Sequence, residues 1–134
     1  MAKVDNILFC LKSVSAGNQG VSANVILSAI TPEYIPGLFS FSVIVSLLDL
    51  DCNGMHTFSV EFVDPNGNKI VNIDKQQLPI KEEESNLPNE YKGINIAMDW
   101  NNVVFKTSGL YSIVIYYDDE KIASKTIYAK GKNE

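Results

Sequence analysis

The sequence predicts an all-β protein, built as an antiparallel sandwich of two sheets with about eight strands. Three observations support this. Apolar residues recur at every second position, turn-forming residues cluster between the alternating runs, and no segment of ten residues shows the spacing of an amphipathic helix. At 134 residues, with 46% hydrophobic residues, the chain is expected to form a single domain, 1–134, around one core.

The strongest strand signals are four alternating runs, near residues 39–48, 56–63, 93–100 and 110–117. These runs are rich in β-branched and aromatic residues, which suit a pleated and half-buried surface. Less regular strands are expected at about 4–12, 22–31, 68–74 and 121–129. Short strands at this spacing favour a sandwich or barrel over units that alternate strands with helices.

Turn chemistry falls between these runs. Asn53 and Gly54 supply positive φ and predict a tight hairpin between the strands near 39–48 and 56–63. Residues 64–67 (DPNG) place Asp first, Pro second and Gly fourth, the order preferred in a type I turn. Residues 118–121 must turn the chain between the last two strands.

Residues 75–92 interrupt the strand pattern with two prolines and a run of three glutamates. Long loops in compact domains are often functional. We nevertheless favour a solvated surface connection here, one that crosses between the two sheets.

Residues 107–111 (TSGLY) resemble the tyrosine corner of immunoglobulin-like sandwiches, where a tyrosine hydroxyl bonds back to upstream backbone as a strand begins. The resemblance implies an immunoglobulin-like arrangement of the sheets and a structural role for Tyr111. The Cys…Trp…Cys signature of antibody-type domains is absent from the sequence.

A second resemblance covers nearly the whole chain. ILFC at 7–10, GMHTF at 54–58, VDPNG at 63–67 and the Gly-x-Tyr strand pair at 109–129 are similar to a small family of uncharacterised bacterial proteins. The sequence departs from the family pattern at residues 16–24. The family has no assigned activity, so the resemblance implies the fold and supplies no site residues.

Charge and cysteine usage limit the partners. The net charge of −5 argues against nucleic acid, which requires a concentrated basic face. The N-terminus does not resemble a secretory signal, and no apolar run approaches the length that spans a membrane. We therefore expect a cytoplasmic protein without a membrane partner, in which Cys10 and Cys52 are free thiols.

Residues 49–54 (DLDCNG) give the sharpest local signal for a metal. Asp49, Asp51 and Asn53 match the oxygen ligands at the start of an EF-hand calcium loop. The twelfth position would be Val60 in place of a glutamate, and both flanks have strand patterns. We expect a hairpin loop here and assign no metal site.

His56 is the only histidine, so a zinc site or a nucleophile–histidine arrangement would have to use it. It lies at the start of a strand, and we interpret it as structural. The acidic turn 118–120 could complete an inter-loop metal site, although the sequence does not place it beside 49–54. Trp100 is expected in the core. We assign no catalytic residue and no cofactor.

The leading functional hypothesis is a non-catalytic protein-interaction or assembly module, because a sandwich without a site is used through its surfaces. Two alternatives stay open. One is a calcium-binding module or metal-dependent enzyme that uses the loop 49–54, and the other is a carrier that holds an apolar ligand between the sheets.

Self-association is suggested by strands with apolar residues on both faces. Ile44 and Leu48 share the outward parity of one strand, and Val114 and Tyr116 share that of another. Soluble monomers rarely expose large apolar patches. We expect a homodimer through an outer face that carries these residues, with cover by the chain's own segment 75–92 as the alternative.

Overall fold

The alternating runs form nine strands in the part of the chain that the computed structural model describes, which comprises residues 2–15, 20–50, 55–78 and 93–133. In chain order the strands are β1 (Lys3–Ser15), β2 (Val21–Ile26), β3 (Ala29–Ile30), β4 (Gly37–Leu48), β5 (Thr57–Val63), β6 (Lys69–Gln77), β7 (Gly93–Phe105), β8 (Gly109–Tyr117) and β9 (Glu120–Ala129). No helix in these residues is long and apolar enough to cross a membrane.

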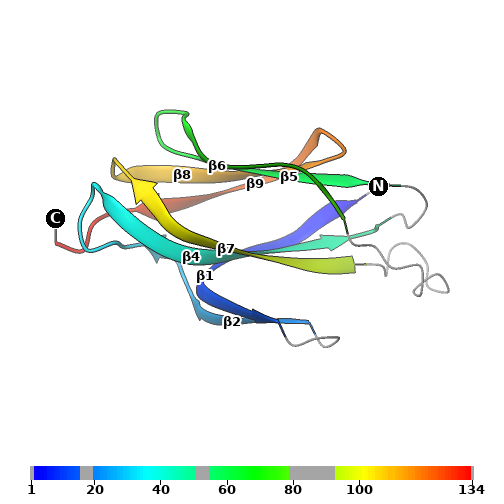
Figure 1. Ribbon diagram of the computed structural model, residues 1–134, viewed down its shortest axis with the longest axis horizontal. Helices are drawn as coiled ribbons and strands as arrows, with labels where there is room; N and C mark the ends of the chain where they lie inside the picture. Colours follow the sequence, from blue (N-terminus) through cyan, green and yellow to red (C-terminus); the bar gives the residue numbers. More distant parts are fainter. Residues whose placement is uncertain (1, 16–19, 51–54, 79–92, 134) are drawn as a thin grey trace.

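The strands form a four-stranded sheet in the order β2-β1-β4-β7 and a five-stranded sheet in the order β3-β9-β8-β5-β6. The two sheets pack face to face (Figure 1). All neighbouring strands are antiparallel except β3 and β9, which form a short parallel pair. The predicted all-β, antiparallel two-sheet sandwich is therefore confirmed.

The strand expected at 22–31 is two strands in different sheets. Residues 21–26 pair with β1, whereas Ala29 and Ile30 pair with β9 in the opposite sheet. The N–H of Leu27 donates to the carbonyl of Phe9 at 2.7 Å and ends the first pairing. The chain then crosses from one sheet to the other, which is why the described residues form nine strands and not about eight.

The predicted hairpin between the strands near 39–48 and 56–63 is wrong. β4 pairs with β1 and β7, while β5 pairs with β6 and β8, so the chain changes sheet between them. Residues 51–54 lie outside the described residues. The predicted crossover segment 75–92 begins within β6, which includes residues 75–77. It leads to β7, and β6 and β7 belong to opposite sheets, as the predicted crossover requires.

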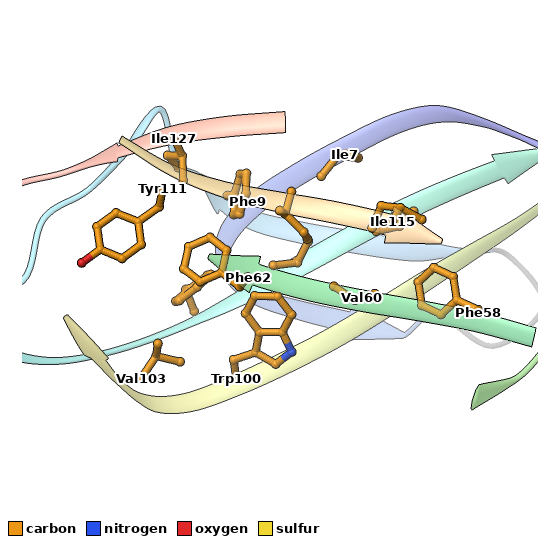
Figure 2. Packing of buried hydrophobic residues seen from close by; sticks show 14 of the residues in the cluster. Ile7, Phe9, Phe58, Val60, Phe62, Trp100, Val103, Tyr111, Ile115 and Ile127 are labelled. Atoms are coloured by element: carbon orange, nitrogen blue, oxygen red, sulfur yellow. The ribbon is translucent and has the colours of Figure 1, made fainter. Parts of the chain in front are cut away.

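The core is a cluster of aromatic rings enclosed by aliphatic residues of both sheets (Figure 2). Phe62 lies near its centre, 5.5 Å from the ring centroid of Trp100 and 5.6 Å from that of Tyr111. Trp100 is 7% exposed, which confirms its predicted place in the core. The alternation in β8 is also confirmed, because Ile113 and Ile115 are fully buried.

The tyrosine corner is formed as the sequence predicts. The Tyr111 hydroxyl donates to the Thr107 carbonyl at 2.7 Å, and the Tyr111 residue is only 1% exposed. Gly109 begins β8 with φ of +142°, a conformation that side chains with a Cβ rarely adopt. A Cβ at Gly109 would lie 3.0 Å from Cγ of Pro65. The corner therefore packs directly against the β5–β6 turn.

The β5–β6 turn is fixed by Asp64. Its carbonyl accepts from the N–H of Gly67 at 3.0 Å, and its Oδ1 accepts from the N–H groups of Asn66 and Asn68 at 3.0 and 2.8 Å. Burial raises the pKa of this carboxyl, but the hydrogen bonds from Asn68 and Asn66, together with the charge of Lys106, outweigh it, so the pKa of Asp64 is lowered. The predicted turn at 64–67 is confirmed.

Candidate functional site

The loop predicted as a possible metal site is only partly described. Asp49 lies just after β4 with φ of +58°, whereas Asp51 and Asn53 lie outside the described residues. Within residues 2–15, 20–50, 55–78 and 93–133, no three histidine, cysteine or acidic side chains gather closely enough to hold a metal ion. The described geometry therefore gives this loop no further ligands.

His56 and Asp118 meet at the end of the sandwich where β5 starts and β8 ends. His56 Nδ1 lies 2.6 Å from Asp118 Oδ2, and Asp118 Oδ1 accepts from the N–H of Thr57 at 2.9 Å. The imidazole stacks on the ring of Tyr117, with 5.2 Å between centroids. Asp118 and Asp119 both have positive φ, as the two central residues of a type I′ hairpin require.

Burial raises the pKa of Asp118, but hydrogen bonds from His56 and Thr57, together with the charge of His56, outweigh it and lower that pKa. The pair thus joins the first residues of β5 to the β8–β9 turn through an ionised carboxylate. A histidine oriented by a carboxylate is also one element of acid–base sites. The contacts with Asp118 and Tyr117 fit a structural role for His56, which stays a prediction.

Cys10 is a free thiol with no exposed surface. Burial raises the pKa of the Cys10 thiol, and the negative charge of Asp99 adds to this, against a smaller opposing effect of the Lys12 backbone. A buried thiol with a raised pKa is a poor nucleophile. Cys10 therefore acts as a small apolar residue, as expected.

A second candidate surface is formed where β1 leaves the body of the sandwich. The last pair between β1 and β4 is Cys10 with Ser42, whereas pairing between β1 and β2 continues as far as Ser15 with Val21. Residues 11–15 and 21–26 thus form a two-stranded extension, which we call the ribbon. Figure 1 shows β2 and the adjoining end of β1 projecting from the packed sheets. Residues 11–14 and 21–26 contribute no side chain to the core cluster.

The ribbon carries much of the exposed apolar surface. Leu11 and Val14 are 45% and 44% exposed, and Val25 and Ile26 are 62% and 63% exposed. These are four of the ten large apolar side chains that are exposed in the described part of the chain. The ribbon has a single charged residue, Lys12, and β2 (VSANVI) has neither a charged residue nor a proline.

The other free edges in the described part of the chain are short or carry charges, whereas β2 carries no charge and its one irregularity is the positive φ of Val25, +58°. Natural proteins keep exposed strand edges from pairing by shortening them, bending them or placing charges on them. β3 has two residues, and β6 carries Lys69, Asp74 and Lys75. The first half of β1 is capped by Lys125, whose Nζ donates to the Ile7 carbonyl at 2.6 Å. β7 carries the charged residue Asp99, and its pairing register with β4 shifts near Asn102, which has a positive φ.

The four residues expected to form one dimer face do not share a face. Ile44 and Leu48 belong to β4 in the four-stranded sheet, and Val114 and Tyr116 belong to β8 in the five-stranded sheet. Their outward faces therefore lie on opposite sides of the sandwich. Ile44 is only 5% exposed, so it offers little surface to a partner. Four of the ten exposed large apolar residues in the described part of the chain lie in the ribbon, and the charge-free sequence of β2 was the signal available for it.

A shallow groove of about 570 Å³ runs along the rim between β6 and β7. It is lined by Ile70 and Val71 of β6, by Trp100 and Val103 of β7, and by polar neighbours that include Lys106. The indole Nε1 of Trp100 is buried and donates no hydrogen bond to any residue that the structure describes. Figure 2 shows this nitrogen on the side of the ring that faces away from Val103.

Solved structures with a related fold are distant in sequence. The alkylpurine DNA glycosylase AlkC of Pseudomonas fluorescens, bound to DNA with an abasic site analog, is 8% identical, with a TM-score of 0.53 over 96% of this chain. The chain spans 30% of the length of that enzyme. An immunoglobulin-like protein from Pseudomonas aeruginosa is 11% identical over 97% of both chains, with a TM-score of 0.49. At such identities the first match supports the sandwich fold alone, and the second is too distant to add to it.

A search of curated proteins found no match. A family profile matches residues 14–130. This range includes the motifs at 54–58 and 63–67 and the strand pair that follows residue 109, and it begins after the motif at 7–10. The resemblance to an uncharacterised family is thereby confirmed, and the chain belongs to DUF6941, a family of unknown function.

Proposed function

We propose that this protein is a non-catalytic protein-interaction or assembly module whose binding surface is the ribbon, residues 11–15 and 21–26. The observation that carries the proposal is the uncharged edge of β2 beside four exposed apolar side chains. An exposed sheet edge binds an extended segment through main-chain hydrogen bonds, and neighbouring apolar residues add specificity. The proposal includes residence in the bacterial cytoplasm, where a thiol such as Cys10 stays reduced.

The energetics favour strand addition over simple apolar contact. Complete burial of a Val, Leu or Ile side chain stabilises by about 1.5–3 kcal/mol. The four apolar side chains of the ribbon are about half exposed or more, so a partner would gain roughly 1 kcal/mol from each. Association costs at least about 4 kcal/mol. The side chains alone therefore barely offset association, and backbone pairing along β2 must supply the remainder.

A charged substitution in the ribbon tests the proposal. Tagged wild-type protein and the Ile26→Lys variant are used to capture partners from a bacterial lysate, with quantitative mass spectrometry. Leu38→Lys is the matched control, because Leu38 is 59% exposed and Ile26 is 63% exposed. Partners should be retained by the wild type and the control and fall at least about tenfold with Ile26→Lys, a loss of about 1.4 kcal/mol. Equal recovery by all three proteins would show that the ribbon is not the binding surface.

A small-ligand carrier is the second candidate, and the groove between β6 and β7 is the observation that favours it. The space between the sheets, where the sequence suggested an apolar ligand, is filled by the aromatic cluster around Phe62. A ligand would therefore bind at the rim, against Ile70 and Val103. Native mass spectrometry of the purified protein would detect a co-purified molecule, and Val103→Glu should abolish its binding.

Nucleic acid is not part of the proposal. AlkC is named as a DNA glycosylase bound to DNA, but this chain matches under a third of it at 8% identity. The net charge of −5 also opposes binding to a phosphate backbone.

A further inference from the structure

We infer that the ribbon binds a second copy of this chain, with the two β2 strands paired antiparallel about a two-fold axis. This inference rests on the proposed function and names the partner. β2 has one strand neighbour among the described residues, β1, so the backbone groups on its other side face outward from the sheet. Two copies joined there would form a continuous sheet of eight strands, in the order β7-β4-β1-β2 followed by β2-β1-β4-β7.

Symmetry is the reason to favour a second copy over a different protein. In a two-fold interface the same residues meet from both sides, so a charged residue near the axis lies close to its own copy. Like charges opposite one another destabilise a strand pair. β2 has no charged residue, whereas β6 carries three and β7 carries Asp99. Lys12 pairs with Asn24 and is therefore one strand away from the junction.

A partner of different sequence would not need this neutrality, because it could place an opposite charge against each charge of the edge. The chain also has a net charge of −5, so two copies repel each other over most of their surface. β2 is the longest edge strand without a charged side chain in the described part of the chain. The uncharged edge of β2 therefore favours self-association in a protein that is acidic overall.

The dimensions of β2 predict a weak dimer. Its six residues span roughly 20 Å, so pairing and contacts of the four apolar side chains bury less than the 800 Å² per partner that is typical of stable complexes. We expect a reversible dimer with a dissociation constant on the order of 10–100 μM. The two-stranded ribbon of each copy would become part of a four-stranded junction, β1-β2 with β2-β1.

Analytical ultracentrifugation of the full chain between about 1 and 500 μM tests the inference. The weight-average mass should rise from 14.8 kDa toward twice that value, 2 × 14.8 = 29.6 kDa. Ile26→Lys should stay at the monomer mass throughout, and Leu38→Lys should behave as the wild type. A wild-type protein that remains at 14.8 kDa at 500 μM, or a dimer that Ile26→Lys leaves unchanged, would overturn the inference.

A cysteine near the middle of β2 gives a second readout that does not depend on a disruptive substitution. Asn24→Cys is made in a Cys52→Ser background, with Asn72→Cys on β6 as the control. Directly opposed residues of an antiparallel pair have Cα atoms 4.5–5.5 Å apart, within the range that a disulfide spans. Mild oxidation should cross-link Asn24→Cys as a dimer and leave the control monomeric. Cross-linking of both variants to the same extent would contradict β2 pairing.

The failure of this inference can be separated from that of the proposed function. If the isolated chain stays monomeric but a different protein is captured from lysate and lost with Ile26→Lys, the ribbon binds another partner and only the self-pairing is wrong. If the chain is monomeric and no partner depends on the ribbon, both proposals fail.

Discussion

Tyr111→Phe measures the tyrosine corner almost in isolation, because it removes one oxygen and leaves the ring. The ring is 1% exposed and packs against Phe62 and Phe105, with centroids 5.6 and 5.0 Å away. Those contacts remain in the variant. The hydrogen bond from the hydroxyl to the Thr107 carbonyl, at 2.7 Å, is lost.

The expected loss in free energy of unfolding is about 1 kcal/mol, the net value of an ordinary hydrogen bond. The penalty of up to about 3 kcal/mol for a stranded buried carbonyl should not apply. Thr107 is an exposed residue, so its carbonyl can bind water once the hydroxyl is gone. In a chain of this size the same loss lowers Tm by roughly 3–5 °C.

Equilibrium urea denaturation is the suitable assay, with an expected midpoint shift of about 0.5 M at an m-value near 2 kcal/mol/M. Tyr128→Phe is the control, because Tyr128 is 66% exposed and its hydroxyl already lies in solvent. The control should differ from the wild type by less than about 0.5 kcal/mol. Equal midpoints for the two variants would refute the reasoning, and a loss above about 3 kcal/mol would mean that the Thr107 carbonyl is stranded.

Three further substitutions test individual features of the fold by denaturation. Gly109→Ala should destabilise by about 1–3 kcal/mol, and by more than Gly67→Ala, because both glycines have positive φ but only the first would press a Cβ against Pro65. Asp118→Asn should destabilise the protein at pH 7 and much less near pH 3. The pKa of Asp118 is lowered in the folded state, so the ionised carboxylate stabilises the fold above its unfolded pKa of about 3.9. This stabilisation is lost as the pH falls through the folded pKa. A constant difference across this range would contradict the assignment. Val25→Asn should stabilise by about 1 kcal/mol, because Val25 is exposed with φ of +58° and asparagine tolerates that conformation better than a β-branched residue. An unchanged free energy of unfolding would mean that the backbone at Val25 is unstrained.

Local patterns predicted the strands and the residues they bury. Alternation places Phe58, Val60 and Phe62 on one face of β5, and all three are buried. The type I turn at 64–67 and the tyrosine corner were also predictable, because each depends on residues within five positions of one another. Interactions of this range are encoded by the order of residues alone.

The assignment of strands to sheets could not be predicted in the same way. Asn53 and Gly54 favour positive φ, but turn chemistry does not decide whether the next strand pairs with β4 or crosses to the other sheet. That choice depends on pairing of β4 with β1 and β7, far away in the sequence. The contact of His56 with Asp118 likewise depends on the register that pairs Phe58 with Tyr117. No spacing rule connects residues that are 62 positions apart.

Ordering the ribbon costs conformational entropy, and this cost relates the fold to the proposed function. Fixing the backbone of one residue costs about 1–2 kcal/mol, and an isolated two-stranded hairpin is at best marginally stable in water. Residues 11–14 of β1 and all six residues of β2 are ordered without placing a side chain in the core. The ribbon contacts the sandwich through polar groups, such as the Ser13 hydroxyl that donates to Asp99 Oδ1 at 3.0 Å. A partner strand along β2 would satisfy backbone groups and cover apolar surface at once. Because the core does not depend on these residues, lysine substitutions there should disturb binding and leave the free energy of unfolding nearly unchanged.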